Sequence, residues 1–254
     1  GGLWKTEDSG QHWFPLFDEQ ATLSIGAIAV APSVTHVLYV GTGEANIFRA
    51  SLPGNGIYRS DDGGRHFRHL GLTNTGTIAR VIVHPYDPNT VYVAASGNEW
   101  TYNPDRGVYK TTDGGQTWNR IFQESGQSGC IDIAFDPYDP DIIYASMWNR
   151  IRKRWSDPVP EDGDHLYRSS DAGKTWTIIS SGLPDTKLTG RIGLAVAPSA
   201  PGTLYAFVDD HTIKREPKEG ETDSYERKVQ KVVVGGVIYR STDRGDHWER
   251  RGEV

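Results

Sequence analysis

An eight-residue pattern, called the box below, occurs five times and constrains the fold more than any other feature. Each box has Ser or Thr at its first position, Asp at the third, Gly at the fifth and Trp or Phe at the eighth. Successive aspartates are 54, 51, 58 and 72 residues apart, and they are Asp8, Asp62, Asp113, Asp171 and Asp243. Self-similarity at such a period indicates an array of small repeated units.

Four short segments, named strands A to D, can be assigned to each complete unit. Strand A ends at a proline, and seven residues later strand B carries a tyrosine: Tyr39, Tyr92, Tyr144 or Tyr205. Strand C has an aromatic residue four positions before the box aspartate, and the box is the turn into strand D. Short Val-, Ile- and Tyr-rich segments between turn residues predict consecutive antiparallel hairpins. We predict an all-β fold, a β-propeller of four-stranded antiparallel blades with Asp-box turns. A solenoid of β-units is the alternative.

The recurrence of the box favours a structural role for its five aspartates over catalysis or metal binding. An aspartate can accept hydrogen bonds from backbone N–H groups of its own turn, and the glycine permits a positive φ. The aromatic side chain is expected to be buried between neighbouring strands. Because catalysis needs one site rather than five equivalent ones, we interpret the boxes as turns that satisfy their own hydrogen bonds.

The units divide the chain into a half blade at 1–18 and blades at 19–70, 71–122, 123–181 and 182–254, all within one propeller segment. The half blade has strands C and D without A and B. We therefore expect the natural polypeptide to be longer, with further blades; a closed ring of five blades is the alternative.

Composition excludes several classes of function. The formal net charge is −6 with no long block of like charge, so nucleic acid is not an expected partner. No stretch is long and apolar enough for a membrane span. The single cysteine, Cys130, lies in an apolar strand pattern and is expected to be buried and inert. The eight histidines have no metal-ligand spacing, and no cofactor is expected.

The boxes and their preceding strands resemble the Asp-box (BNR) repeat of sialidases, sortilin-type receptors, photosystem II assembly factors and xyloglucan-cleaving hydrolases. Phrases such as 24–30, 39–46 and 190–198 look like the sortilin-like propellers of large exported bacterial proteins, a group often labelled glycosyl hydrolase or sialidase. The resemblance implies a propeller and an extracellular, periplasmic or cell-surface location. The catalytic residues do not carry over: Arg191-Ile192-Gly193 lacks the proline of the sialidase phrase, and no Tyr–Glu pair can be assigned.

Length variation among the units is concentrated between strands B and C. The interval from the strand-B tyrosine to the strand-C tyrosine is 19, 17, 23 and 34 residues, whereas the other intervals are nearly constant. Insertions on one face of a repeat protein often mark its binding face. The B–C loops and their margins contain the candidate binding residues Glu44, Arg49, Glu99, Trp100, Trp148, Arg150, Arg152, Arg154 and Trp155. The longest loop, 209–234, mixes charges of both signs and is expected to be mobile.

Two strand-A positions break an apolar pattern. Arg80 and Asp132 occupy the same register in consecutive units, where the other units have Ala27 and Gly193. Since innermost strands line the central channel of a propeller, we expect an ion pair there, with a polar ligand site as the alternative.

These observations predict a non-catalytic propeller segment of a larger exported protein, which binds another protein or a glycan through its B–C loops. The alternative is a glycoside hydrolase, sialidase-like or xyloglucanase-like, that uses carboxylates of the same face.

Overall fold

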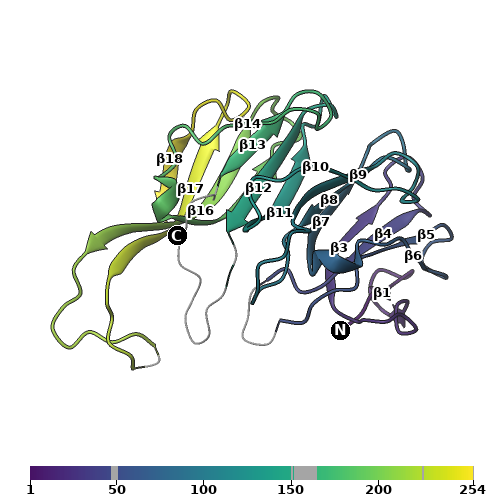
Figure 1. The fold of residues 1–254 in the computed structure, drawn as a ribbon, viewed down its shortest axis with the longest axis horizontal. Helices are drawn as coiled ribbons and strands as arrows, with labels where there is room; N and C mark the ends of the chain where they lie inside the picture. The colour runs from purple at the N-terminus through teal and green to yellow at the C-terminus, as the bar shows by residue number, and fades with distance from the viewer. Residues whose placement is uncertain (47–50, 150, 152–164, 225, 254) are drawn as a thin grey trace.

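The structure, a computed structural model, describes residues 1–46, 51–149, 151, 165–224 and 226–253. Its strands form a row of antiparallel sheets in chain order, so the prediction of an all-β propeller architecture is confirmed. The first sheet is a two-stranded hairpin of β1 (Trp4–Lys5) and β2 (Phe14–Pro15). Four sheets of four strands follow it, and Figure 1 shows them side by side.

Each four-stranded sheet, called a blade below, is a meander in which consecutive strands are neighbours. The second sheet has β3 (Ile25–Val30), β4 (Leu38–Thr42), β5 (Ile57–Ser60) and β6 (Arg68–His69). The third has β7 (Ile78–Val83), β8 (Val91–Ala95), β9 (Gly107–Thr111) and β10 (Asn119–Phe122). The fourth has β11 (Ser128–Phe135), β12 (Ile143–Asn149), β13 (Leu166–Ser169) and β14 (Thr177–Ile178). The fifth has β15 (Thr189–Val196), β16 (Leu204–Arg215), β17 (Val232–Ser241) and β18 (Glu249–Glu253). Two 3-10 turns, η1 (Thr73–Thr75) and η2 (Thr186–Leu188), precede β7 and β15.

The core lies between the blades. The faces of neighbouring blades meet in three apolar clusters, centred on Tyr39 with Val81, on Tyr92 with Ile133, and on Tyr144 with Leu194. The three tyrosines are at most 1 % exposed. Burial of apolar side chains contributes roughly 1.5–3 kcal/mol for each large residue, so stacking of one blade on the next is the main source of stability.

All five boxes have the same hydrogen bonds. The first Ser or Thr hydroxyl donates to the aspartate at 2.7–2.9 Å and accepts the glycine N–H at 2.8–3.0 Å. The aspartate also accepts the backbone N–H four residues later, at 2.8–3.0 Å. Every box glycine has a φ between 88° and 95°. The structural interpretation of the boxes agrees with this geometry, since each aspartate is satisfied within its own turn.

The expected burial of the box aromatic is complete in the fifth sheet and partial in the second, third and fourth sheets. Trp248 is 4 % exposed and donates to the Ile179 carbonyl, whereas Trp13 in the two-stranded hairpin is 55 % exposed. The prediction is therefore wrong for Trp13, because the hairpin lacks the strands that would cover the ring.

The longest B–C segment contains strand pairing that the sequence did not indicate. β16 and β17 continue past the body of the blade, and they pair as far as Arg215 with Val232. Figure 1 shows them as an arm that projects from the fifth sheet. Arg215 forms two hydrogen bonds with Glu221, at 2.8 and 2.9 Å, near the end of the arm. Strand pairing thus extends into 209–234 from both ends, while the mobility of the segment stays a prediction.

The boxes predict a specific loss of stability in acid. Hydrogen bonds from Thr175 lower the pKa of Asp171 from 3.8 to about 2, and the pKa of Asp243 is likewise about 2. A lowered pKa in the folded state stabilises the protein above the unfolded-state value, and this contribution disappears as pH falls through the folded-state value. The melting temperature should therefore drop between pH 4 and pH 2. In Asp171→Asn that drop should be shallower, and a slope identical to that of the parent chain would contradict the account.

Candidate functional site

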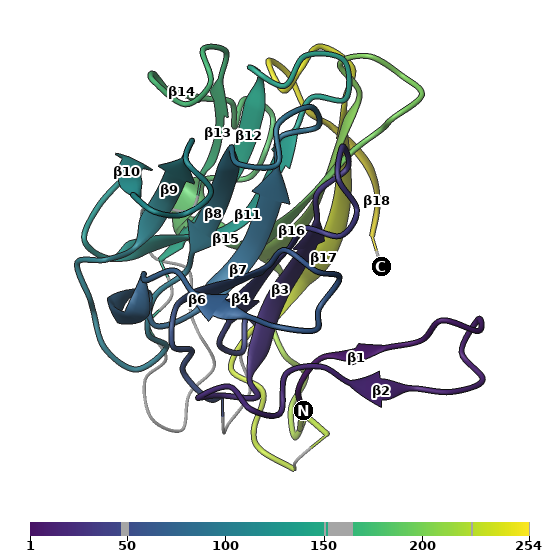
Figure 2. The same cartoon turned by 90° about the vertical axis from the view of Figure 1, so that its right-hand side faces the viewer.

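The B–C loops lie at the opposite end of the blades from the boxes. In a four-stranded meander the A–B and C–D turns share one end, and the B–C connections leave from the other. Figure 2 shows the row from its N-terminal side, with β3 and β7 in succession. The two ends therefore offer different surfaces, one built from repeated turns and one from loops of variable sequence.

A pocket of about 130 Å³ opens between the B–C loops of the second and third sheets. It brings together three predicted binding residues, Glu44, Glu99 and Trp100, although 54 residues separate the two carboxylates in sequence. The rest of its lining consists of Ser51, Leu52, Pro53, Thr77, Asn98 and Thr101. Glu99 is 6 % exposed, whereas Trp100 is 46 % exposed. The pocket thus combines carboxylate acceptors with an aromatic ring that a ligand can reach.

Local hydrogen bonds position the Glu44 side of the pocket. The Leu52 N–H donates to the Glu44 carboxylate at 3.1 Å, and the Glu44 N–H donates to the Leu52 carbonyl at 3.0 Å. Gly54 donates to the Gly76 carbonyl of the next blade, so this loop is tied to its neighbour. Both the carboxylate and the backbone N–H of Glu44 are thus tied to Leu52 across the loop.

A buried arginine, Arg106, organises the Glu99 side. Its guanidinium donates to the carbonyls of Asn98, Thr101 and Gln127 at 2.6, 3.0 and 2.7 Å. It also donates to the Asn103 side chain at 3.1 Å. Burial lowers the pKa of Arg106 to about 10. Because Arg106 satisfies carbonyls on both sides of Glu99 and Trp100, it fixes the path of the loop that carries them.

The ion pair expected on the innermost strands is present. Arg80 Nε lies 3.5 Å from the Asp132 carboxylate, and each residue sits where its strand has a register shift. Asp132 also accepts the N–H groups of Ile133 and Leu194, both at 3.0 Å. Burial raises the pKa of Asp132, and the Leu194 hydrogen bond and Arg80 oppose that rise. These contacts join the third, fourth and fifth sheets, while a ligand role for the pair stays a prediction.

One predicted binding residue is buried in the core, and five others lie outside the described residues. Trp148 is 7 % exposed within β12, so it belongs to the core rather than to a binding surface, and that prediction is wrong. Strand β12 runs to Asn149, further than the sequence pattern indicated, and it therefore includes the tryptophan. The predictions outside the described residues concern Arg49, Arg150, Arg152, Arg154 and Trp155.

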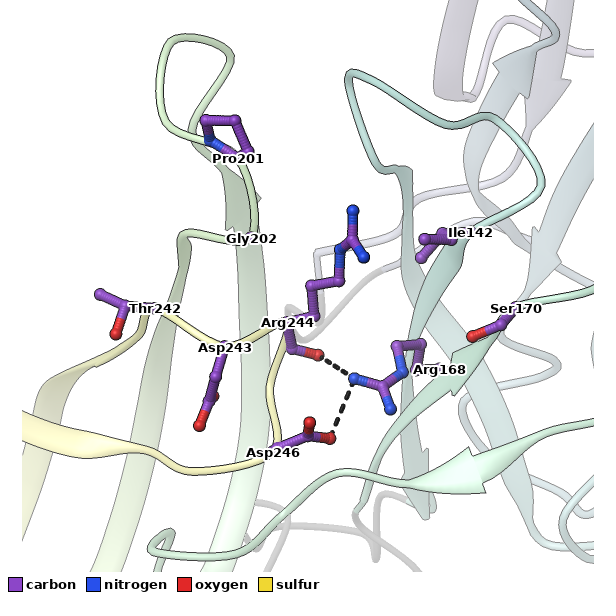
Figure 3. A pocket seen from close by; sticks show the side chains of 9 residues that line it. All are labelled: Ile142, Arg168, Ser170, Pro201, Gly202, Thr242, Asp243, Arg244 and Asp246. Atoms are coloured by element: carbon purple, nitrogen blue, oxygen red, sulfur yellow. Dashed lines mark hydrogen bonds and ion pairs between the residues drawn. The ribbon is translucent and has the colours of Figure 1, made fainter.

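The larger cavity lies on the box end, and sequence reasoning missed it. It has a volume of about 490 Å³ between the fourth and fifth sheets, and Figure 3 shows the side chains around it. Arg168 pairs with Asp246 at 2.9 Å and donates to the Arg244 carbonyl at 2.9 Å. The Arg244 guanidinium lies 3.4 Å from the buried Asp136. The charged groups are thus paired with each other, as in a junction between blades. The sequence signal for this cavity was the Lys or Arg that follows each strand-C aromatic residue, which is Arg168 in the fourth sheet.

No group of three or more His, Cys, Asp or Glu side chains that could hold a metal ion occurs among the described residues. Cys130 is buried, and burial raises the pKa of its thiol, as expected for an inert core cysteine. No helix in the described part of the chain is long and apolar enough to cross a membrane.

Fold and turns together define an Asp-box β-propeller segment. The family model for sortilin (neurotensin receptor 3), Sortilin-Vps10, matches residues 55–191, which is more than half of the chain. The chain therefore belongs to the Sortilin-Vps10 family.

Curated relatives include xyloglucanases. Xyloglucanase Xgh74A of Acetivibrio thermocellus is 30% identical over 184 residues, which cover 68% of this chain and 19% of that protein. The dispase autolysis-inducing protein of Streptomyces mobaraensis is 35% identical over 80 residues, or 32% of this chain and 21% of that protein. The matches thus cover only about a fifth of each of these relatives.

Solved structures of similar fold include GH74 enzymes. An ancestral GH74 enzyme superposes with a TM-score of 0.69 at 17% identity, over 98% of this chain and 28% of the other. The GH74 xyloglucanase of Xanthomonas campestris gives 0.55 at 19% identity, over 98% of this chain and 42% of the other. At these identities the likeness establishes the fold alone.

The Arg106 network predicts a strong and local effect of substitution. Arg106→Met should leave the three partly buried carbonyls without their donor, at a cost of roughly 2–4 kcal/mol in the free energy of unfolding. Amide hydrogen exchange should become faster around 98–103, and Trp100 fluorescence should change. Arg65→Met, at an exposed arginine, is the matched control and should change neither. Equal stability of the two variants would show that Arg106 does not hold the loop.

Proposed function

We propose that this chain is a non-catalytic binding segment whose ligand is a glycan, bound at the pocket between the B–C loops of the second and third sheets. The observation that carries the proposal is the meeting of Glu44, Glu99 and the exposed Trp100 ring in that pocket. Sugar hydroxyls donate to carboxylates, and the apolar face of a sugar ring packs on an indole. The sequence alone left a protein or a glycan open as the ligand.

The chemistry of the pocket favours the glycan over a protein. A volume of about 130 Å³ suits one sugar unit of a longer chain rather than the large apolar anchor of a protein partner. The xyloglucanases among the relatives suggest a β-glucan with xylose branches as the first ligand to test. Such a polysaccharide lies outside the cytoplasm, and we accordingly place the protein outside it, as the family resemblance implies.

The second candidate is a glycoside hydrolase, which is favoured by the presence of two carboxylates in one pocket. Hydrolysis requires one carboxyl group that stays protonated to act as an acid and a second that is ionised. Burial raises the pKa of the Asp132 carboxyl group, but this residue does not line the pocket, and its oxygens accept two backbone N–H groups and pair with Arg80. Those contacts suit a structural role, so binding without hydrolysis is the better-supported function.

The proposal predicts that xyloglucan oligosaccharides bind and are not cleaved. Trp100→Ala should weaken binding roughly tenfold or more, because the stacking surface is lost, and Glu99→Gln should weaken it without unfolding the chain. The measurement is isothermal titration calorimetry, with product analysis of the same mixture. Trp4→Ala is the matched control, since Trp4 is 50 % exposed on the β1–β2 hairpin. Cleavage that Glu99→Gln abolishes would replace this proposal with the hydrolase.

A further inference from the structure

A polar cluster lies beside the pocket, where the first strands of the four blades come together. β3 is in contact with β7, β7 with β11, and β11 with β15, and Figure 2 shows these strands in succession. Three of the strands contribute a charged side chain, which are Arg80 on β7, Asp132 on β11 and Arg191 on β15. These three residues and Asn46 are called the channel cluster below.

Two cations of the channel cluster share one carboxylate. Arg80 Nε lies 3.5 Å from the Asp132 carboxylate. Burial raises the pKa of Asp132, and the positive charges of Arg80 and Arg191 both act against this rise. Asp209, on the neighbouring β16, is paired with His211 at 2.9 Å. Asp132 balances only one of the two guanidinium groups, so the channel cluster has an excess of positive charge.

Both guanidinium groups have donors left over. Arg191 Nη1 donates to the Asn46 side-chain oxygen at 3.0 Å, which is the one hydrogen bond of this side chain among the described residues. The Arg80 side chain is 57 % exposed, and Asp132 is its one partner in the same part of the chain. Because a guanidinium group carries five N–H donors, most donors of both arginines remain for a ligand.

The channel cluster is next to the proposed glycan pocket. Asn46 follows Glu44 of the pocket lining by two residues, and Arg80 follows Thr77 of the lining by three. Two residues of extended chain span at most about 7 Å. The hydrogen bond between Asn46 and Arg191 also joins the B–C loop of the second sheet to the first strand of the fifth. A ligand longer than one sugar can therefore touch both places.

Pocket and cluster select different chemical groups. The pocket has the carboxylates of Glu44 and Glu99, which accept hydrogen bonds from sugar hydroxyls and repel an anion. The channel cluster offers two arginines, whose planar guanidinium groups bind a carboxylate through paired N–H donors. A neutral sugar thus fits the pocket, and an acidic sugar fits the cluster.

We propose that the channel cluster binds the carboxylate of a uronic acid residue while a neutral sugar of the same glycan occupies the pocket. The ligand class is then a polysaccharide that carries both neutral and acidic residues. This inference rests on the proposed function, because the pocket supplies the site for the neutral sugar. Arg191 is the residue that distinguishes it from a purely structural ion pair, since Asp132 already pairs with Arg80.

The test compares neutral xyloglucan oligosaccharides with the same oligosaccharides in which one primary hydroxyl group per molecule, at any position, is oxidised to a carboxylate. Both are passed over the immobilised 254-residue chain, and the retained molecules are identified by chromatography and mass spectrometry. One positional isomer of the acidic set should be enriched roughly tenfold over its neutral parent at low salt. About 1 M sodium chloride should remove this enrichment, because exposed charges are then screened.

Arg191→Gln should abolish the enrichment and leave retention of the neutral oligosaccharides unchanged. Its melting temperature should equal that of the parent chain, because the side chain has one hydrogen bond to lose among the described residues. Arg65→Gln removes the same charge from an exposed position in the second box and is the matched control, which should keep the enrichment. Trp100→Ala should lower the retention of both sets.

The outcomes separate this inference from the proposed function. Equal retention of the acidic and neutral sets by the parent chain would overturn the inference and leave the proposed function in place. Enrichment that persists in Arg191→Gln would place the carboxylate elsewhere and would overturn it as well. Retention of neither set would overturn both the proposed function and this inference.

Discussion

The hydrogen bonds within the box turn are the interaction on which the rest of the structure depends. An Asp carboxylate that accepts backbone N–H groups at about 3 Å closes the turn between strands C and D in every blade. The closed turn sets a left-handed residue directly after the aspartate. That residue points its carbonyl at the preceding blade, where a cation from strand C donates to it. One local turn therefore determines both the end of a blade and its attachment to the previous one.

Because the box end serves the turns and the junctions in this way, we propose that ligand binding belongs to the other end. The B–C loops do not contribute to the repeated junction contacts, so they can vary in length and residue type without loss of the fold. Arg106 illustrates how one such loop is nevertheless made rigid, through buried hydrogen bonds to three carbonyls. Rigid loops on a regular scaffold are suited to hold the carboxylates and the indole of one pocket in fixed positions.

The sequence predicted the features that recur in every unit better than the features that occur once. Strand order, box geometry and the Arg80–Asp132 pair follow from positions that recur at constant intervals, so each copy supports the others. Trp148 was misassigned because the end of β12 depends on pairing with Gly129, which no repeat reveals. The meeting of Glu44, Glu99 and Trp100 depends on the path of two loops and on the buried Arg106. Sequence placed these residues on one face but could not show that they share a pocket.

The central claim is that ligand binds at the B–C end and the boxes serve only the fold. The most direct measurement follows the indole N–H signals of the tryptophans by nuclear magnetic resonance during titration with a xyloglucan oligosaccharide. The account predicts that the Trp100 signal moves, while the signals of Trp118 and Trp248, whose indoles donate to carbonyls between strands, stay in place. Movement of the box tryptophans with an unchanged Trp100 signal would contradict it.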